Sequence, residues 1–386
     1  MWQAQVNKIK EYIKENEKEI IATWERFVNT YSGTMEPDKV NEFAGLCKTE
    51  LENIGAKCKL VEEKDKASTL IAVLGEDRKE KPVLLSSHLD TVFGREDFQE
   101  NPFHIKDGIA YGPGVIDDKG GIVIALYTMK ALEHIGFDKR PVKLILSGDE
   151  ELGRRLSKCE EMYLKEAEGC LCAFNLEAGQ EDNRLCIGRK GKIECDITVS
   201  GVRAHAANCG EKGKNAIVEM SHKIIDLQKL NDEKRGIIIN VGTIRGGTLS
   251  NVVPAACTAK VDIRYKSADD YESIKDSVLQ ICDKTYIDGT KTNAVFAQSF
   301  PPFETTIADF ELYEKASDVS NRLGYGHVGG VTLNDGSDSA YINKAGVPVV
   351  CAFGAQGSKN HTKQEYAIVD SIFNRAVWLS SLILDL

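Results

Sequence analysis

The sequence predicts an α/β protein of two domains, in which a smaller α+β domain is inserted into a larger α/β domain. Its 386 residues, 42% of them hydrophobic, are more than one compact core usually holds. Short apolar runs alternate with longer helical stretches, which is typical of an α/β sheet. From about residue 190 the order changes to strand, helix, strand, strand, helix, strand, and after about residue 302 the α/β pattern returns. We therefore expect the larger domain over 1–188 and 302–386, and the inserted domain over 189–301.

The elements of the larger domain follow from hydrophobic spacing. Apolar residues recur at intervals of three to five through residues 1–55, which predicts about two amphipathic helices. The runs TLIAVLG, PVLLSS, VKLILSG and CAFNLE predict strands, because each is bounded by Gly, Pro, Ser or charged residues. The segment GGIVIALYTMKALEHIG predicts a helix that packs on this sheet and ends near Gly136. The element order of the inserted domain is typical of a ferredoxin-like α+β fold.

Charge and cysteine content exclude several classes of protein. Acidic residues outnumber basic ones by 59 to 49 and no Lys/Arg-rich run is present, so we expect no nucleic-acid partner. The N-terminal segment MWQAQVNKIKEYIKENEKEI lacks an apolar core, so we expect no secretory signal, no membrane span and a cytoplasmic location. The eleven cysteines are scattered from Cys47 to Cys351 without a CxxC pair, which predicts reduced, mostly buried thiols.

Polar residues that can bind metal follow several of the predicted strands. In LLSSHLDTV, His88 ends a strand, and Asp90 can hold the other ring nitrogen of that histidine. In YGPGVIDDKGG, Asp117 lies between a glycine-rich turn and the predicted helix. In LILSGDEELG, Glu150 and Glu151 end another strand, where a turn would be needed for both to serve one site. A structural histidine and solvated turn acids remain the alternatives for each residue taken alone.

Two further residues complete the set. Glu177 follows the apolar run of AFNLEAG, and His361 lies in KNHTKQEY near the end of the chain. Carboxylates and imidazoles are the ligands that zinc takes where thiolates are absent. The combination of strand-end and loop positions therefore predicts a metal site.

The motifs SSHLDTV, GPGVIDDKGG, SGDEELG, NLEAG, GVRAHAAN and NHTKQEY occur in the order found in M20 family metallopeptidases, which this sequence resembles over about residues 80–370. The resemblance is to the carboxypeptidase G2 and acetylornithine deacetylase kind, and it implies a zinc-peptidase catalytic domain with an inserted lid and dimerisation domain. It implies that Asp117 bridges two Zn²⁺ ions, for which Co²⁺ or Mn²⁺ could substitute. His88 and Glu177 would complete one site, and Glu151 and His361 the other. Glu150 would be the general base that activates a zinc-bound water.

The resemblance also assigns residues of the inserted domain. His205 in GVRAHAAN matches a histidine that stabilises the oxyanion in the partner subunit's active site, which implies a homodimer formed through the lid. Asn251 and Arg264 match positions that hold the substrate carboxylate. Gly336 and Ser337 resemble a substrate-binding turn, and Gly354 and Gly357 lie shortly before His361. A surface histidine and a strand-surface charge are the alternatives for His205 and Arg264.

Together these features predict a di-zinc hydrolase that cleaves an amide or peptide bond beside a free carboxylate, as a carboxypeptidase or dipeptidase does. The alternative is a deacylase that acts on N-acyl amino acids, and a non-catalytic metal-binding protein is a third reading that the intact Glu150 argues against. The substrate is then a small peptide or an N-acyl amino acid. Arg154 and Arg155 follow the paired acids, where the family commonly has a Gly-Ser type segment, and they favour a substrate with an extra acidic group.

Overall fold

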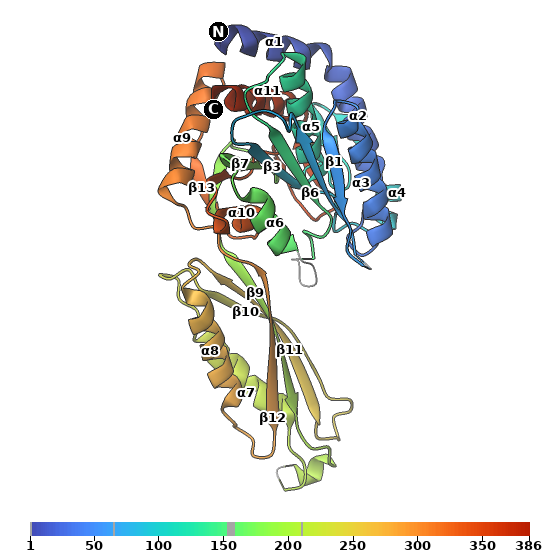
Figure 1. Cartoon of the computed structure of the whole chain (residues 1–386). Coiled ribbons are helices and arrows are strands. Elements are labelled where there is room, and N and C mark those ends of the chain that lie inside the picture. Colours follow the sequence, from blue (N-terminus) through green and yellow to red (C-terminus); the bar gives the residue numbers. More distant parts are fainter. Residues whose placement is uncertain (1, 65, 153–158, 210) are drawn as a thin grey trace. The chain divides into compact units, whose positions relative to one another are not determined.

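The computed structural model describes residues 2–64, 66–152, 159–209 and 211–386 (Figure 1). The chain divides into two compact units. The first comprises residues 1–188, 305–332 and 337–386, and the second comprises residues 189–304 and 333–336.

The first unit is built around a six-stranded mixed sheet. Its order is β1 (Lys57–Val61), β2 (Thr69–Leu74), β6 (Val142–Ser147), β3 (Val83–His88), β7 (Cys172–Asn175), β14 (Val349–Val350). The last four strands are parallel, and β1 and β2 are antiparallel to their neighbours. Strand β3 is buried along its whole length, as expected for a central parallel strand covered on both faces.

Helices surround this sheet. They are α1 (Trp2–Glu15), α2 (Glu17–Asn29), α3 (Pro37–Glu52), α4 (Arg95–Glu100), α5 (Lys119–His134), α6 (Cys159–Ala167), α9 (Ile307–Leu323), α10 (Ser339–Lys344) and α11 (Val369–Asp385). Helix α5 packs between β3 and β6 on one side and α2 and α11 on the other, so that nearly all of it is buried. The first 55 residues form three helices rather than about two, because the helical run breaks at Asn16.

Shorter strands complete the first unit. An antiparallel sheet contains β15 (Gly357–Ser358), β16 (Tyr366–Ile368), β5 (Ile109–Tyr111) and β4 (His104–Lys106). Strands β8 (Leu185–Arg189) and β13 (Gly330–Leu333) pair with each other. Because β5 precedes Asp117 and the loop between β15 and β16 contains His361, this small sheet joins two of the predicted ligand segments.

The second unit is a four-stranded antiparallel sheet with two helices. Its elements are β9 (Gly191–Ser200), the short 3₁₀ helix η1 (Ala206–Asn208), α7 (Ala216–Gln228), β10 (Ile238–Gly246), β11 (Ala256–Tyr265), α8 (Asp270–Asp283) and β12 (Lys291–Phe300). The sheet order is β10, β11, β9, β12, which with the βαββαβ sequence is the ferredoxin-like arrangement. Alternate residues of β9 face the core, and the buried pair Glu219 and Lys223 ties α7 to the end of α8.

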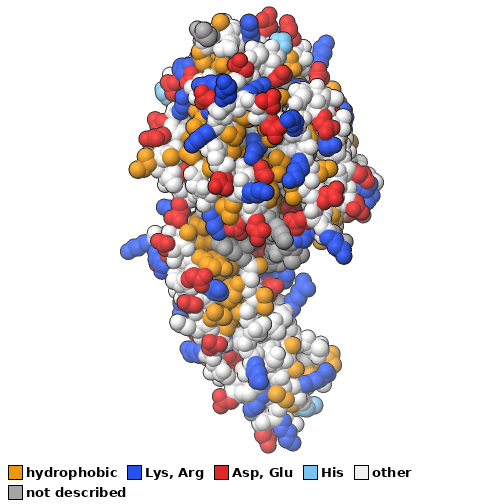
Figure 2. Space-filling model, in the orientation of Figure 1, with side chains coloured by type: hydrophobic (Ala, Val, Ile, Leu, Met, Phe, Trp, Pro, Cys, Tyr) orange, Lys and Arg blue, Asp and Glu red, His pale blue; other side chains and the backbone are white. Residues whose placement is uncertain are grey.

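The distribution of surface charge and the state of the cysteines match what the composition predicts. Figure 2 shows Lys and Arg side chains intermingled with Asp and Glu on the visible face of each unit, without a continuous basic surface. All eleven cysteines are free thiols and nine are buried, whereas Cys209 is exposed. Among the described residues no helix is both long and apolar enough to cross a membrane.

Candidate metal centre

Three neighbouring parallel strands end at the same edge of the main sheet, and each is followed by predicted ligands. The register pairs His88 of β3 with Ser147 of β6, and Ser86 of β3 with Asn175 of β7. Glu150 and Glu151 follow β6 in a turn, and Glu177 follows β7. The carboxyl ends of parallel strands are where open α/β sheets form their sites, and this topology brings the three segments together.

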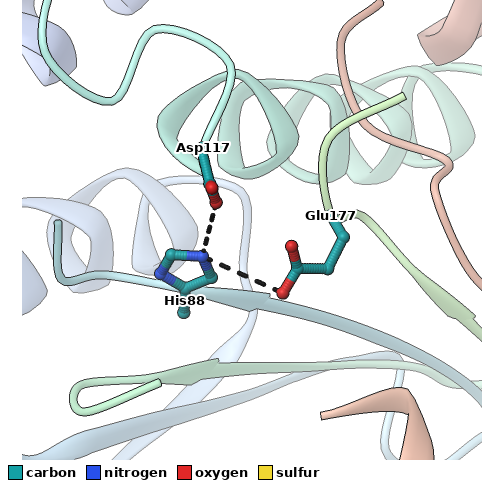
Figure 3. Close-up of side chains that lie close together, drawn as sticks. All are labelled: His88, Asp117 and Glu177. Carbon is teal, nitrogen blue, oxygen red and sulfur yellow. Dashed lines mark hydrogen bonds and ion pairs between the residues drawn. The ribbon is translucent and has the colours of Figure 1, made fainter. Parts of the chain in front are cut away.

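His88, Asp117 and Glu177 form one group of side chains (Figure 3). Nε2 of His88 lies 3.0 Å from Oδ1 of Asp117 and 3.9 Å from Oε1 of Glu177. Nδ1 of the same ring lies 3.0 Å from the backbone oxygen of Asp90. A carbonyl oxygen only accepts, so Nδ1 carries a proton, and Nε2 is the ring nitrogen that faces the two carboxylates and that could bind a metal after losing its own proton.

Asp117, Glu151 and His361 form a second group, which shares Asp117 with the first. Nε2 of His361 lies 3.2 Å from Oδ2 of Asp117 and 3.1 Å from Oε2 of Glu151. In each group the candidate ligand atoms all lie within 4.8 Å of one another. The two oxygens of Asp117 thus face different histidines, which is the geometry of a carboxylate that can bridge two cations.

Asp90 fixes the groups around it. Its side chain is fully buried, and Oδ1 and Oδ2 accept hydrogen bonds from the backbone N–H groups of Glu150 and Glu151, both at 3.1 Å. Oδ1 also lies 3.3 Å from Nδ1 of His88. One carboxylate therefore orients the imidazole and also holds the turn that carries both glutamates.

Two residues near the centre were not predicted from the sequence, although both lie in the KNHTKQEY segment. Glu365 is fully buried, and its Oε1 accepts hydrogen bonds from the backbone N–H groups of Ile116 and Asp117 at 3.0 and 3.2 Å. Asn360 donates from Nδ2 to Oδ2 of Asp117 at 3.0 Å. Both residues tie the His361 loop to Asp117. Their spacing within a loop resembles that of ordinary solvated polar residues, so the sequence holds no signal for them.

Gly354 is required where the strand segments approach each other. A Cβ atom at this position would lie 2.1 Å from the backbone oxygen of Leu176 and 2.6 Å from that of Glu177. The backbone N–H of Gly354 donates to the oxygen of Glu177 at 3.0 Å. Gly354 therefore supports the backbone of Glu177.

The electrostatics of the centre favour a cation. Burial raises the pKa of the Glu150 carboxyl well above its usual range, and the charge of Glu177 raises it further. Burial and Asp117 also raise the pKa of Glu151, whereas hydrogen bonds with Asp117 and Glu151 raise the pKa of His361 to about 11. Oε1 of Glu151 is buried without a hydrogen-bond partner among the described residues. Crowded buried carboxylates with an unsatisfied oxygen and two imidazoles form a donor set that fits divalent metal ions.

The second unit contains the other predicted residues at two places. His205 is exposed, and its Nδ1 accepts the backbone N–H of Ala207 at 3.2 Å, so a neutral ring carries its proton on Nε2. The backbone oxygen of exposed Asn251 accepts the N–H of Ala206 at 3.0 Å, which places Asn251 beside His205. Arg264 lies near the other end of β11, where Asp262 holds its guanidinium with contacts of 2.7 and 3.2 Å.

The predicted substrate-binding turn is divided between the units. Gly336 belongs to the second unit, and a Cβ atom there would lie 2.4 Å from the ring of Phe300. Ser337 belongs to the first unit, where it is fully buried and its hydroxyl contacts Oγ of Ser339 at 2.5 Å. Arg154 and Arg155 lie outside the described residues.

Comparison with known proteins decides the family. A model described as peptidase family M20/M25/M40 matches residues 84–385. The chain belongs to this family. It is an M20 metallopeptidase or amidohydrolase with the mixed α/β fold of that family, and the two groups around Asp117 have a geometry that could hold metal ions.

The names of two relatives of this M20 enzyme describe different activities. Carboxypeptidase G2 from Pseudomonas sp. (strain RS-16) is 27% identical over 95% of this chain and 89% of its own length. A succinyl-diaminopimelate desuccinylase from Ehrlichia chaffeensis is 26% identical over 72% of this chain and 74% of its own. The crystal structure of a tripeptidase from Staphylococcus aureus superposes with a TM-score of 0.78 at 20% identity, covering 95% of this chain and 98% of that one, and supports the fold alone.

The position of Asp90 predicts that Asp90→Asn weakens metal binding by about 10- to 100-fold, because the amide cannot accept all the hydrogen bonds that orient His88 and the glutamate turn. Competition with a coloured chelator measures the affinity. Asp77→Asn, at an exposed position away from the centre, is the matched control. Wild-type affinity in a folded Asp90→Asn protein would show that Asp90 does not position the ligands.

Proposed function

We propose that this M20 enzyme is a di-zinc hydrolase that cleaves an amide or peptide bond beside a free carboxylate, in the manner of a carboxypeptidase or dipeptidase. The observation that carries the proposal is the pair of ligand groups sharing Asp117, with buried Glu150 next to them. Metal centres of this kind serve hydrolysis when a proton-transferring group lies beside the ligands.

His88, Asp117 and Glu177 would hold one zinc ion, and Asp117, Glu151 and His361 the other, with Co²⁺ or Mn²⁺ as substitutes. Bound cations would make a water molecule more acidic and polarise the scissile carbonyl. Three ligand carboxylates offset most of the charge of two divalent ions, so the filled centre avoids a large buried excess of either sign.

Glu150 is the proposed general base. Its backbone is fixed by Asp90, its side chain is buried, and its charge interacts with Glu177 and His88. In the proposed reaction its carboxylate takes a proton from the attacking water and returns that proton to the nitrogen of the leaving amine. A carboxyl whose pKa is raised by its surroundings is suited to both steps.

Residues of the second unit would bind the substrate. Nε2–H of His205 is a hydrogen-bond donor that can stabilise the oxyanion, and the amide of Asn251 lies beside it. Arg264, held by Asp262 as a fixed fork, would bind the substrate's free carboxylate. Gly336 and Ser337 remain proposed contacts, although Ser337 would need to leave its buried position for its hydroxyl to reach a ligand.

The geometry also supports a homodimer in which the second unit is the dimerisation domain. Along β11, Arg264 lies on the order of 25 Å from the end that carries His205 and Asn251, at the usual rise of a strand. One rigid sheet therefore cannot direct both ends at one small substrate, and His205 would act in the site of a partner. Strand β10 is an edge strand of the sheet among the described residues, and α7 beside it exposes Val218 and Ile225, so this edge offers a partner backbone groups with apolar side chains next to them.

The alternative function is deacylation of N-acyl amino acids, because the relatives include a desuccinylase as well as a carboxypeptidase. Both reactions cleave an amide and need the same centre. They differ in the group that lies on the acyl side of the bond.

The deciding measurement is mass spectrometry of a mixture of dipeptides, their C-terminal amides and N-acyl amino acids, incubated with zinc-reconstituted enzyme. We expect loss of the dipeptides that carry a free carboxylate and not of their amides, because Arg264 needs an anion to bind. Selective loss of N-acyl amino acids would favour the deacylase. No cleavage of any compound would contradict hydrolytic function.

Glu150→Ala is expected to reduce kcat by about 100- to 10,000-fold while the protein retains its metal, because the variant loses proton transfer but none of the proposed ligands. Metal content by elemental analysis and kcat on the best substrate are measured on the same sample. Glu168→Ala, at an exposed position after α6, is the control. Near-normal turnover in Glu150→Ala would remove Glu150 from the mechanism.

Mixing two inactive variants tests action across the dimer. In a heterodimer of His205→Ala and Glu150→Ala subunits, one site would combine an intact Glu150 with an intact His205 of the partner. Random exchange of equal amounts should therefore restore about a quarter of wild-type activity. Each variant incubated alone is the control. No recovery, with exchange verified by native mass spectrometry, would show that His205 acts within its own chain.

A further inference from the structure

The second unit has a cavity that none of the roles above uses. It has a volume of about 370 Å³ and is lined by Arg203 before η1, by Arg245 and the Gly246–Gly247 turn at the end of β10, and by residues at the start of β11. A neighbouring cavity of about 420 Å³ shares the turn and extends to Ala206 and Ser250. Both volumes lie in the range of pockets that bind small molecules.

The two glycines keep this cavity open. Gly247 has a φ of +76°, which side-chain-bearing residues rarely adopt. A Cβ atom on Gly246 would lie 3.0 Å from Sγ of Cys257 and 3.0 Å from Cγ1 of Ile217. Because neither position accommodates a side chain easily, the turn adds no side chain to the cavity that it lines.

The cavity is positively charged. Arg203 and Arg245 are exposed, neither makes a hydrogen bond or an ion pair with another described residue, and no described carboxylate lines the cavity. The chain as a whole carries a formal charge of −10, so the positive charge of this cavity is opposite in sign to the net charge of the protein. Both guanidinium groups line the same cavity, so an anion bound there would be attracted by two positive charges.

The cavity adjoins the surface proposed to meet the substrate. Its wall residue Val252 pairs with His205 in an isolated β-bridge, and Val253 donates its backbone N–H to the oxygen of Ala204 at 2.8 Å. Arg203 precedes His205 by two residues on this segment. The segment that carries His205 therefore forms part of the cavity wall, and a substrate in contact with His205 would extend toward the cavity.

We propose that Arg203 and Arg245 form a subsite for a second carboxylate of the substrate, in addition to the one that Arg264 holds. The inference rests on the proposed function, because it requires the His205 surface to meet a substrate. The preferred substrate is then a dianion, whose extra carboxylate lies either on an amino-acid side chain or on the acyl group. Bidentate pairing of carboxylates with arginine provides the specificity.

Three substrate pairs test the subsite and locate the extra carboxylate. They are Ala-Glu with Ala-Gln, Glu-Ala with Gln-Ala, and N-succinyl-alanine with N-succinamyl-alanine, so that each pair differs only by a carboxylate replaced with its amide. The ratio of kcat/KM within each pair is measured for wild type, Arg203→Gln, Arg245→Gln and the control Lys234→Gln. Lys234 is an exposed residue in the turn before β10, and its replacement removes the same charge from the same unit.

We expect the wild type to prefer the acid in at least one pair by about tenfold or more, and each arginine variant to lose most of that preference through KM, whereas Lys234→Gln retains it. The pair that shows the effect identifies where the carboxylate lies. Equal use of acid and amide by wild type, or a preference unchanged in both arginine variants, would overturn the subsite. Hydrolysis of the amide members would still uphold the proposed function in that case.

A binding measurement separates failure of the subsite from failure of the function. Saturation-transfer NMR compares succinate with succinamate on the full-length wild type and on the same variants. A succinate signal that is weaker in Arg203→Gln and Arg245→Gln but not in Lys234→Gln supports the subsite even if no pair is hydrolysed. A signal that is absent, or equal in all four proteins, overturns it.

Discussion

The centre depends on one shared carboxylate. Asp117 directs one oxygen toward His88 and the other toward His361, so that two groups of ligands have a side chain in common. Burial alone would raise the pKa of this carboxyl, but hydrogen bonds with both histidines outweigh burial and hold the pKa below its usual range. Glu365 fixes the Asp117 backbone in turn. A change at any of these contacts would alter the spacing of both groups at once.

The remaining acids are held together by backbone structure rather than by attraction between them. When they are ionised, Glu150, Glu151 and Glu177 carry like charges, and their proximity in a buried place is then unfavourable without cations. The parallel strands β6, β3 and β7 force this proximity, because their register places the following residues at one edge. Asp90 adds a fixed turn after β6. The fold therefore stores an electrostatic cost that bound divalent ions would relieve.

Much of the metal centre could be predicted from the sequence, because the residues at the ends of the predicted strands also lie in the motifs of the family. His88 ends one apolar run and Glu177 follows another, both runs are bounded as strands are, and the order of the motifs adds the pairing of the candidate ligands. The hydrogen bonds that Asp90 accepts from the backbone N–H groups of Glu150 and Glu151 span some 60 residues and depend on the pairing of β3 with β6, so they require the folded structure. The resemblance to the family proposed Ser337 as a substrate contact, but it could not predict that the hydroxyl of this residue is buried and contacts Ser339. Residues 333–336 join the second unit although they are distant from it in sequence.

The second unit places its functional candidates at opposite ends of one sheet. The pairing of β11 with β9 continues without interruption from the end near His205 to Arg264, so the two places are parts of one body. Under the proposed pairing of subunits, that body contributes Arg264 to one active site and His205, with the adjoining arginine cavity, to the other. Substrate held at one site would then restrain residues that serve the second. In such a dimer the length and continuity of β11 would set the distance between the two sites.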